Sequence, residues 1–496
     1  MSKKVAIRRL PTGVPGLDAI LGGGLPEYSF NLIAGIPGSG KTTLAHQMMF
    51  HLANPARRAL YFTVLGEPPL KMLRYQQQFP FFDPDKVGTS IRFVNLASDL
   101  LKRDLKKVLD TIVQEVEADS PGLVFIDSFR SVMLAVENQP GADNALQGFV
   151  QELGMHLTSW EATTFLVGEY DDADSQSNPI FTVADGLIWL TQETYQGSMV
   201  RKLEVKKMRG QATLPGQHTF RIGDHGVQVF PRRIQESSMQ KAKPGRSRAI
   251  KRMSLGVPAL DEMLGGGLPE GYSLLVAGPS GSGKTILATE FLSEGVRRGE
   301  NGVVAAFEKS PGLSLSRALD PMVRSKKVGI ISTRSLDLSI DETLHEISEN
   351  VKRLKAKRVV IDSLSGFELA LAPSYRDDFR DSTYRMISAL TSMGVTVLVT
   401  SELEDRYTDL RFSPYGAAFL TDAIIVERYV QLEDELRRCL AVVKVRDSDH
   451  SKELREFKVV KGRIVIGDAL SGYEGLLSGR VTAREPALRR AGAKKR

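Results

Sequence analysis

GVPGLDAILGGGLPEYSFNLIAGIPGSGKTTLA (13–45) recurs in the same chain as GVPALDEMLGGGLPEGYSLLVAGPSGSGKTILA (256–288), at a constant offset of 243 residues. Of the 33 aligned positions 22 are identical and no gap is needed, which indicates an internal duplication. A repeat of this length is far too long for a solenoid, so each copy is expected to be a complete domain. The chain of 496 residues is too long for one hydrophobic core and has room for two or three domains of ordinary size.

The predicted domain limits follow from composition. We expect a first domain over 1–236 and a second over 253–470. Between them, SSMQKAKPGRSRAIKR (237–252) lacks apolar periodicity and is typical of an exposed basic linker. The last segment, 471–496, is rich in Arg and Lys and is expected to be a flexible tail.

Short apolar runs alternate with longer helical patterns in both copies, as in βαβ units. We therefore predict two α/β domains in tandem, each a mostly parallel sheet flanked by helices. The first copy has candidate strands at 30–35, 59–66, 122–127 and 163–168, and the second has them at 273–278, 302–307, 358–362 and 395–400.

The net charge of +7 is concentrated outside the predicted domains. Residues 237–252 hold six Lys or Arg and no acid, and 479–496 hold seven against Glu485, so the rest of the chain is net negative. A nucleic-acid-binding domain carries its positive charge on a folded face. Nucleic acid is therefore not the expected partner.

The compartment is expected to be the cytoplasm. Cys439 is the single cysteine and cannot form an internal disulfide, and the N-terminal MSKKVAIRRLPTG lacks the apolar core of a secretion signal. No run of about 18 uncharged apolar residues exists, so no membrane-spanning helix is expected.

GIPGSGKT (35–42) and GPSGSGKT (278–285) match the phosphate-binding loop G-x-x-x-x-G-K-[ST], and in each copy a strand-like run precedes the loop while a helix-like run follows it. Backbone N–H groups of such a loop cradle phosphates, the lysine reaches the β- and γ-phosphates, and the hydroxyl ligates Mg²⁺. ATP and Mg²⁺ are the expected cofactors. The predicted nucleotide-binding residues are Gly35, Gly38, Ser39, Gly40, Lys41, Thr42 and Thr43 in the first copy, and Gly278, Gly281, Ser282, Gly283, Lys284, Thr285 and Ile286 in the second.

Metal binding also needs an acid at the end of a neighbouring strand. Asp127 ends GLVFID and Asp362 ends RVVID, each after the phosphate loop of its own copy. We predict that they hold Mg²⁺, usually through water, together with Thr42 and Thr285.

Hydrolysis requires a group that orients or deprotonates water. The candidates follow the second strand of each copy: Glu67 in VLGEPP and Glu308 in AAFEKSP. Later in each copy a Lys-x-Arg recurs, formed by Lys207 with Arg209 and by Lys444 with Arg446. A positive group supplied by a neighbouring subunit stabilises the transition state in ring ATPases, and we predict this role for both pairs.

Together these features resemble KaiC, the RecA-superfamily ATPase family of the circadian clock. The resemblance covers residues 10–467 and rests on the duplication, the L-G-G-G-L-P entry, the two loops, the strand-end acids and the Lys-x-Arg pairs. It implies two RecA-like P-loop domains per chain and a double-ring hexamer with ATP at subunit interfaces. It also implies that the first domain is chiefly an ATPase, while the second phosphorylates itself as well.

The chain departs from the family at two places. The family has adjacent glutamates after the second strand, where this chain has Gly66-Glu67 and Glu308-Lys309. Glu67 stands one residue later than the family's general base, where a strand directs it to the opposite face. The family's Ser-Thr phosphorylation pair is replaced by Ala418 and Phe419.

The leading hypothesis is therefore a KaiC-like hexameric ATPase that acts in signalling or timing through an unknown protein partner. Autokinase activity of the second domain stays open, with Thr421 or Ser413 as acceptors. A RecA-like DNA recombinase or helicase is the alternative, since it would share the same ATP site. A third reading is a binding switch that holds ATP without cleaving it.

Overall fold

The computed structural model describes residues 7–63, 69–100, 105–134, 142–159, 161–171, 173, 178–195, 197–232, 251–307, 313–332, 338–376, 378–403, 420–432, 434–471, 473–474 and 482–483. Contacts within the chain divide it into two compact units, Met1–Arg233 and Ile234–Arg496. Nearly all of the predicted linker lies outside the described residues, so the exact domain limits stay predictions. None of the helices in the described ranges has the length and apolar composition needed to cross a bilayer.

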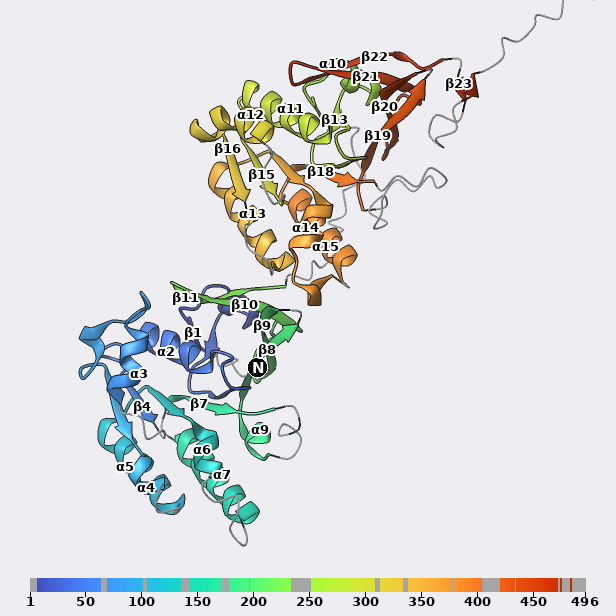
Figure 1. Ribbon diagram of the computed structural model, residues 1–496. Coiled ribbons are helices and arrows are strands. Elements are labelled where there is room, and N and C mark those ends of the chain that lie inside the picture. The colour runs from blue at the N-terminus through green and yellow to red at the C-terminus, as the bar shows by residue number, and fades with distance from the viewer. Residues whose placement is uncertain are drawn as a thin grey trace, which may run out of the picture. The chain divides into compact units, whose positions relative to one another are not determined.

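The first unit is a large sheet with helices on both faces (Figure 1). Its strands are β1 (Arg9–Leu10), β2 (Leu25–Pro26), β3 (Phe30–Gly35), β4 (Ala59–Thr63), β5 (Ile91–Asn95), β6 (Leu123–Asp127), β7 (Thr163–Glu169), β8 (Gly186–Tyr195), β9 (Ser198–Met208), β10 (Gln217–Gly223) and β11 (Gly226–Phe230). Its helices are α1 (Leu17–Ile20), α2 (Lys41–Leu52), α3 (Pro69–Gln76), η1 (Pro84–Lys86), α4 (Ala97–Leu100), α5 (Leu105–Asp119), α6 (Phe129–Leu134), α7 (Ala142–Ser159) and α9 (Ile180–Val183).

The second unit repeats this plan (Figure 1). Its strands are β12 (Arg252–Met253), β13 (Leu268–Pro269), β14 (Ser273–Gly278), β15 (Gly302–Ala306), β16 (Val328–Ser332), β17 (Arg358–Asp362), β18 (Thr396–Glu402), β19 (Ala423–Leu432), β20 (Glu435–Val445), β21 (Leu454–Val460), β22 (Arg463–Ala469), β23 (Tyr473–Glu474) and β24 (Thr482–Ala483). Its helices are α10 (Pro258–Met263), α11 (Lys284–Arg297), α12 (Leu313–Arg324), α13 (Ile340–Leu354), α14 (Leu364–Ala370), η2 (Pro373–Tyr375) and α15 (Phe379–Ser392).

Each unit contains a nine-stranded sheet that is mostly parallel, which confirms the predicted fold class. The orders are β11-β10-β9-β8-β3-β7-β6-β4-β5 and β16-β15-β17-β18-β14-β19-β20-β21-β22. The strands from β8 to β5, and from β16 to β19, run parallel. The remaining three strands of each sheet are antiparallel and were not predicted from the sequence.

The two largest hydrophobic cores of each unit lie on opposite faces of the sheet. Successive side chains of a strand point to opposite faces. Ile33 of β3 therefore packs in the core that contains α2, whereas Leu32 and Ala34 join α5 and α7 in the other. Strands buried on both faces in this way read as continuous apolar runs, and this is why the central strands were predictable from sequence.

A buried arginine supports the second unit. Arg358 at the start of β17 is 1% exposed, yet its guanidinium donates to a Glu300 carboxylate oxygen at 2.7 Å and to the carbonyls of Ser254 and Phe291 at 2.8 Å each. A side chain on Gly295 would collide with it, since an ideal Cβ would stand 2.6 Å from Arg358 Cδ. One side chain thus links three separate segments of the unit.

We expect Arg358→Ala to destabilise the second unit by about 3 kcal/mol, because it leaves two buried carbonyls and Glu300 without their donor. Both tryptophans, Trp160 and Trp189, lie in the first unit. In denaturant unfolding, the transition of the second unit followed by circular dichroism should therefore move to a lower denaturant concentration. The transition of the first unit followed by tryptophan fluorescence should stay unchanged.

The matched control for that experiment is Arg324→Ala, which removes an exposed ion pair to Asp320 at 3.3 Å. It should change the free energy of unfolding by less than about 0.5 kcal/mol. Equal effects of the two substitutions would contradict a structural role for Arg358.

Candidate functional site

Both predicted phosphate loops lie at the carboxyl edge of their sheets, between a central strand and a helix. The first loop joins β3 to α2 and the second joins β14 to α11. The residue before each helix, Gly40 or Gly283, has a positive φ of 98° or 139°, a backbone conformation that side chains oppose. The N–H groups at the start of each helix therefore point into the loop, as anion binding requires.

The loop lysines fold back over their own loops. Lys41 Nζ donates to the Ile36 carbonyl at 2.8 Å, and Lys284 Nζ donates to the carbonyls of Gly278 and Pro279 at 2.8 and 2.7 Å. Burial lowers the pKa of Lys41, and the charges of Glu169 and Asp127 oppose that shift. Each ammonium group is thus held at the position where phosphate oxygens would contact it.

The structure brings each predicted metal-binding pair together. Thr42 donates from its hydroxyl to Asp127 Oδ2 at 2.8 Å, and Thr285 donates to Asp362 Oδ2 at 2.9 Å. One hydroxyl and one carboxylate at the loop form an oxygen donor set of the kind that suits Mg²⁺ completed by phosphate and water. The residues present therefore fit the ion that the sequence predicts.

A second donor holds each acid, and it comes from a different neighbouring strand in the two units. Tyr61 of β4 donates to Asp127 Oδ2 at 2.7 Å, whereas Thr400 of β18 donates to Asp362 Oδ1. Burial raises the pKa of Asp127, while the hydrogen bonds from Tyr61 and Thr42 lower it. The buried ring of His46 meets the Tyr61 ring edge-on, with 4.7 Å between the ring centroids. Burial lowers the pKa of His46 to about 3, so the imidazole stays neutral.

The predicted water-activating residues cannot be placed, because Glu67 and Glu308 both lie outside the described residues. Two acids that the sequence analysis missed do lie at the same edge. Glu169 ends β7 and Glu402 ends β18, and they pair in register with Gly35 and Gly278. Their recurrence at equivalent strand ends, in TTFLVGE and TVLVTSE, is the signal that could have found them.

A cavity of about 240 Å³ lies at the second loop, lined by Lys284, Thr285, Asp362 and Glu402 among others. Pockets that enclose a whole small ligand are commonly about 300–1,000 Å³. The cavity has the size and polarity for the phosphate end of a nucleotide, while ribose and base would extend beyond it.

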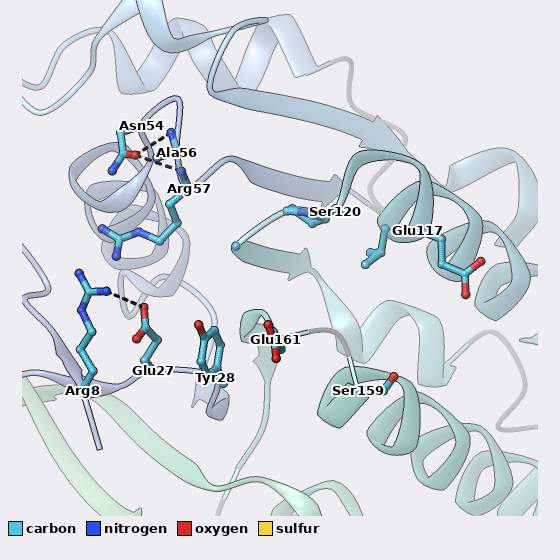
Figure 2. A pocket seen from close by; sticks show the side chains of 13 residues that line it. Arg8, Glu27, Tyr28, Asn54, Ala56, Arg57, Glu117, Ser120, Ser159 and Glu161 are labelled. Atoms are coloured by element: carbon cyan, nitrogen blue, oxygen red, sulfur yellow. Dashed lines mark hydrogen bonds and ion pairs between the residues drawn. The ribbon is translucent and has the colours of Figure 1, made fainter. Parts of the chain in front are cut away.

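A separate cavity of about 810 Å³ lies in the first unit, at the opposite edge of the sheet (Figure 2). It is lined by residues that precede central strands, such as Tyr28 before β3 and Glu161 before β7. Figure 2 shows Arg8 reaching toward Glu27 at its side, in an ion pair of 3.8 Å. None of its described lining residues belongs to the phosphate loop, so it is no part of the predicted site.

The Lys-x-Arg pairs lie away from the phosphate loop of their own unit. Met208 pairs with Gly186 at the start of β8, and Gly186 pairs with Asn31 near the start of β3, whereas the loop follows the end of β3. In the second unit Val445 pairs with Ala423, which pairs with Leu274 near the start of β14. Both pairs therefore stand at the amino edge of their sheets, and contact with the phosphate site of their own unit is excluded.

Local hydrogen bonds fix both pairs at that edge. In the first unit, Lys207 donates to the Thr182 carbonyl at 3.0 Å and Arg209 to Asp185 Oδ1 at 3.0 Å. In the second, Lys444 donates to the Thr421 carbonyl at 2.7 Å and Arg446 to Asp422 Oδ1 at 3.0 Å. The equivalent contacts in the two units show that the two pairs are held alike.

Of the family's phosphorylation segment, only its end is described. Ser413, Ala418 and Phe419 lie outside the described residues, while Thr421 is buried and its hydroxyl has no hydrogen-bond partner in the described structure. The Thr421 hydroxyl is therefore not accessible to a phosphate in the described arrangement.

Comparison with known proteins gives a consistent result over nearly the whole chain. A family model described as "ATPase: KaiC" matches twice, at residues 10–234 and 253–471. The chain is 26% identical to the "Circadian clock oscillator protein KaiC" of Picosynechococcus sp., over 96% of this chain and 93% of that protein. It is 27% identical to proteins of the same name from Prochlorococcus marinus, with 96% of both chains covered, and Parasynechococcus marenigrum, with 98% and 96% covered.

The contact between Tyr61 and Asp127 leads to a test of the first site. Tyr61→Phe removes one of the two donors to Asp127, so it should raise the Mg²⁺ concentration needed for ATP binding there by about ten-fold. The measurement is ATP binding against Mg²⁺ concentration in a Lys284→Ala chain, which leaves only the first site intact.

Thr400→Val in the same Lys284→Ala chain is the matched control, because Thr400 holds the acid of the other unit. It should leave the Mg²⁺ dependence unchanged. An equal Mg²⁺ requirement in the Tyr61→Phe chain and its parent would contradict the role of Tyr61.

Proposed function

This chain belongs to the KaiC family of ATPases, and we propose that it binds Mg·ATP at both phosphate loops and hydrolyses it. The observation that carries the proposal is the repeated arrangement of a loop lysine, Lys41 or Lys284, beside a hydroxyl–carboxylate pair at hydrogen-bond distance. A single glycine-rich loop would be weaker support than the same set of contacts in two units.

Each residue has a specific task at the site. The loop backbone and its lysine bind the β- and γ-phosphates, and Thr42 with Asp127, or Thr285 with Asp362, would hold Mg²⁺. When bound, the ion offsets the negative charge of the phosphates. Tyr61 and Thr400 keep the carboxylates oriented by donating hydrogen bonds to them.

Hydrolysis further requires a residue that orients the attacking water. Glu308 in the second domain stands at the family position of the general base, and Glu67 substitutes for it in the first from one residue further on. Glu402 and Glu169 lie at the strand ends beside the loops and are additional candidates to accept the proton of that water.

The active form is a homo-oligomer, most simply a hexamer with ATP between subunits. Lys207 with Arg209, and Lys444 with Arg446, lie at the sheet edge opposite the loops of their own units, which supports a role toward phosphates that a neighbouring chain brings to that edge. Across that interface they stabilise the negative charge that develops on the transferred phosphoryl group.

The biological role is a signalling or timing ATPase whose nucleotide state is read by a protein partner. The similar proteins are named circadian clock oscillators, and this chain shares their two-domain organisation. Because Ala418 and Phe419 replace the family's phosphorylation pair, autokinase activity would need another acceptor, such as Thr421 or Ser413.

The direct test uses γ-labelled ATP with Mg²⁺ and follows free phosphate and protein-bound label together. The wild-type chain should release phosphate. Lys41→Ala should abolish the release that comes from the first site, and Lys284→Ala the release that comes from the second. No phosphate release from the wild type would contradict hydrolysis and favour a binding switch, whereas strong stimulation by DNA would favour a DNA motor.

The protein-bound label in the same experiment tests for autokinase activity. Label that is lost with Lys284→Ala but kept with Lys41→Ala would mean that the second domain is an autokinase. Absence of label on the wild-type chain would mean that the phosphorylation cycle is absent.

The proposed role of Arg209 across the interface predicts complementation between two inactive chains. Lys41→Ala and Arg209→Ala, each combined with Lys284→Ala, should be nearly inactive alone. Co-expressed with different tags and purified through both, they should recover about a quarter of the activity of Lys284→Ala alone, because random assembly pairs an intact loop with an intact arginine at about one interface in four.

Nucleotide binding by the Arg209→Ala chain should stay intact, which separates a catalytic loss from misfolding. Mixed assemblies as inactive as their components would contradict the action of Arg209 on a neighbouring chain.

A further inference from the structure

A buried carboxyl group lies under the phosphate loop of the second unit. Glu427 of β19, the strand next to β14, is 0% exposed. An ideal Cβ on Gly278 would lie 2.9 Å from Glu427 Cβ, and one on Gly283 would lie 3.6 Å from Glu427 Oε2. The carboxyl group therefore packs against the backbone that would wrap the phosphates.

The carboxyl group of Glu427 lies near positive groups but lacks hydrogen-bond donors in the described part of the unit. Neither carboxylate oxygen accepts a hydrogen bond in the described part of the unit; the Ser282 hydroxyl lies nearby without the geometry of a full hydrogen bond. Two positive groups face it, Lys284 from α11 and Arg438 from β20. Phe457 of β21 closes the space near Gly283, with its Cε2 3.3 Å from an ideal Cβ there.

These surroundings favour the neutral acid. Burial raises the pKa of Glu427 to about 7, although Ser282, Lys284 and Arg438 all act to lower it. The group therefore changes its charge near neutral pH, beside a loop that binds an anion. A carboxylate there repels phosphate and competes for Lys284, whereas a carboxylic acid does neither.

The first unit has no such group at the corresponding place. Val426 pairs with Ala277 in the second sheet, and Trp189 pairs with the equivalent Ala34 in the first. The next residue, Glu427 in β19, thus corresponds to Leu190 in β8. Leu190 is also buried but carries no charge. At this position a carboxyl group therefore lies under the loop of the second unit, and an apolar side chain lies under the loop of the first.

We propose that the second ATP site takes up a proton at Glu427 when nucleotide phosphates enter its loop, whereas the first site binds them without this proton. The inference rests on the proposed binding of nucleotide at both loops. The phosphates bring negative charge close to Glu427, and the proton taken from solvent onto its carboxylate removes the repulsion. Binding at the second site therefore weakens as pH rises through neutrality.

Calorimetry with Mg·ADP measures this proton directly. The chain carries Lys41→Ala so that only the second site binds, and each titration is repeated at about pH 7 in two buffers of different ionisation enthalpy. Compared with Lys41→Ala/Glu427→Gln, the chain that retains Glu427 should take up about half a proton more per ADP. The proton exchange of the nucleotide itself cancels in this comparison.

The same pair of chains should differ in the pH dependence of affinity. Between about pH 6 and pH 8, the affinity for Mg·ADP should fall about five-fold more in the chain that retains Glu427 than in the chain that carries Glu427→Gln. Glu427→Leu, which copies Leu190 of the first unit, should behave like Glu427→Gln. This second variant shows whether the effect comes from the charge or from a change in packing.

A Lys284→Ala chain, which retains only the first site, is the control for the difference between the units. Glu427→Gln added to it should change neither proton uptake nor affinity. Equal proton uptake with and without Glu427 in the Lys41→Ala chain would overturn the inference while leaving nucleotide binding intact. No binding of ADP by the Lys41→Ala chain at any pH would overturn both this inference and the proposed function of the second loop.

Discussion

In each unit a hydrogen bond joins the helix after the phosphate loop to a strand two places away in the sheet: Thr42 to Asp127 in the first, Thr285 to Asp362 in the second. The contact requires that the strand before the loop and the strand that ends in the acid run in the same direction and end at the same edge of the sheet. Only a parallel arrangement provides this. The loop glycines allow the turn from strand to helix, and the buried strands hold the two ends of the contact in place. The hydroxyl and the carboxylate that we propose as metal-binding groups thereby lie at hydrogen-bond distance in both units.

The two units share this contact but support it differently. In the first, Tyr61 holds the acid and the neutral ring of His46 packs against Tyr61. In the second, Thr400 holds the acid from the opposite neighbouring strand, and the residue corresponding to His46 is Thr289, whose hydroxyl donates to the Thr285 carbonyl at 2.8 Å. With Leu190 and Glu427 beneath the loops, the sites combine the same phosphate-binding groups with different buried surroundings. We therefore expect the two sites to respond differently to pH and metal.

The Lys-x-Arg pairs place a constraint on assembly. Each pair is fixed by hydrogen bonds at the amino edge of its sheet, where it cannot meet the loop of its own unit. A cation held at this edge could act on bound phosphates only if the loop of another unit came to that edge. The proposed catalytic role of both pairs therefore depends on assembly beyond the single unit.

The sequence by itself determined the duplication, the fold class, the central strands and both phosphate loops, because these depend on local patterns: continuous apolar runs, glycine spacing and helix periodicity. It also predicted Asp127 and Asp362 as metal-binding acids, since a strand-end acid recurs in both copies. Tertiary structure alone decided what depends on side chains that are distant in sequence. Tyr61 and Thr400 meet the two acids from different strands, the Lys-x-Arg pairs lie at the far edge, and Glu427 lies under a loop that comes much earlier in the chain. Strand order and register set these contacts, and neither is written in the local pattern of any single strand.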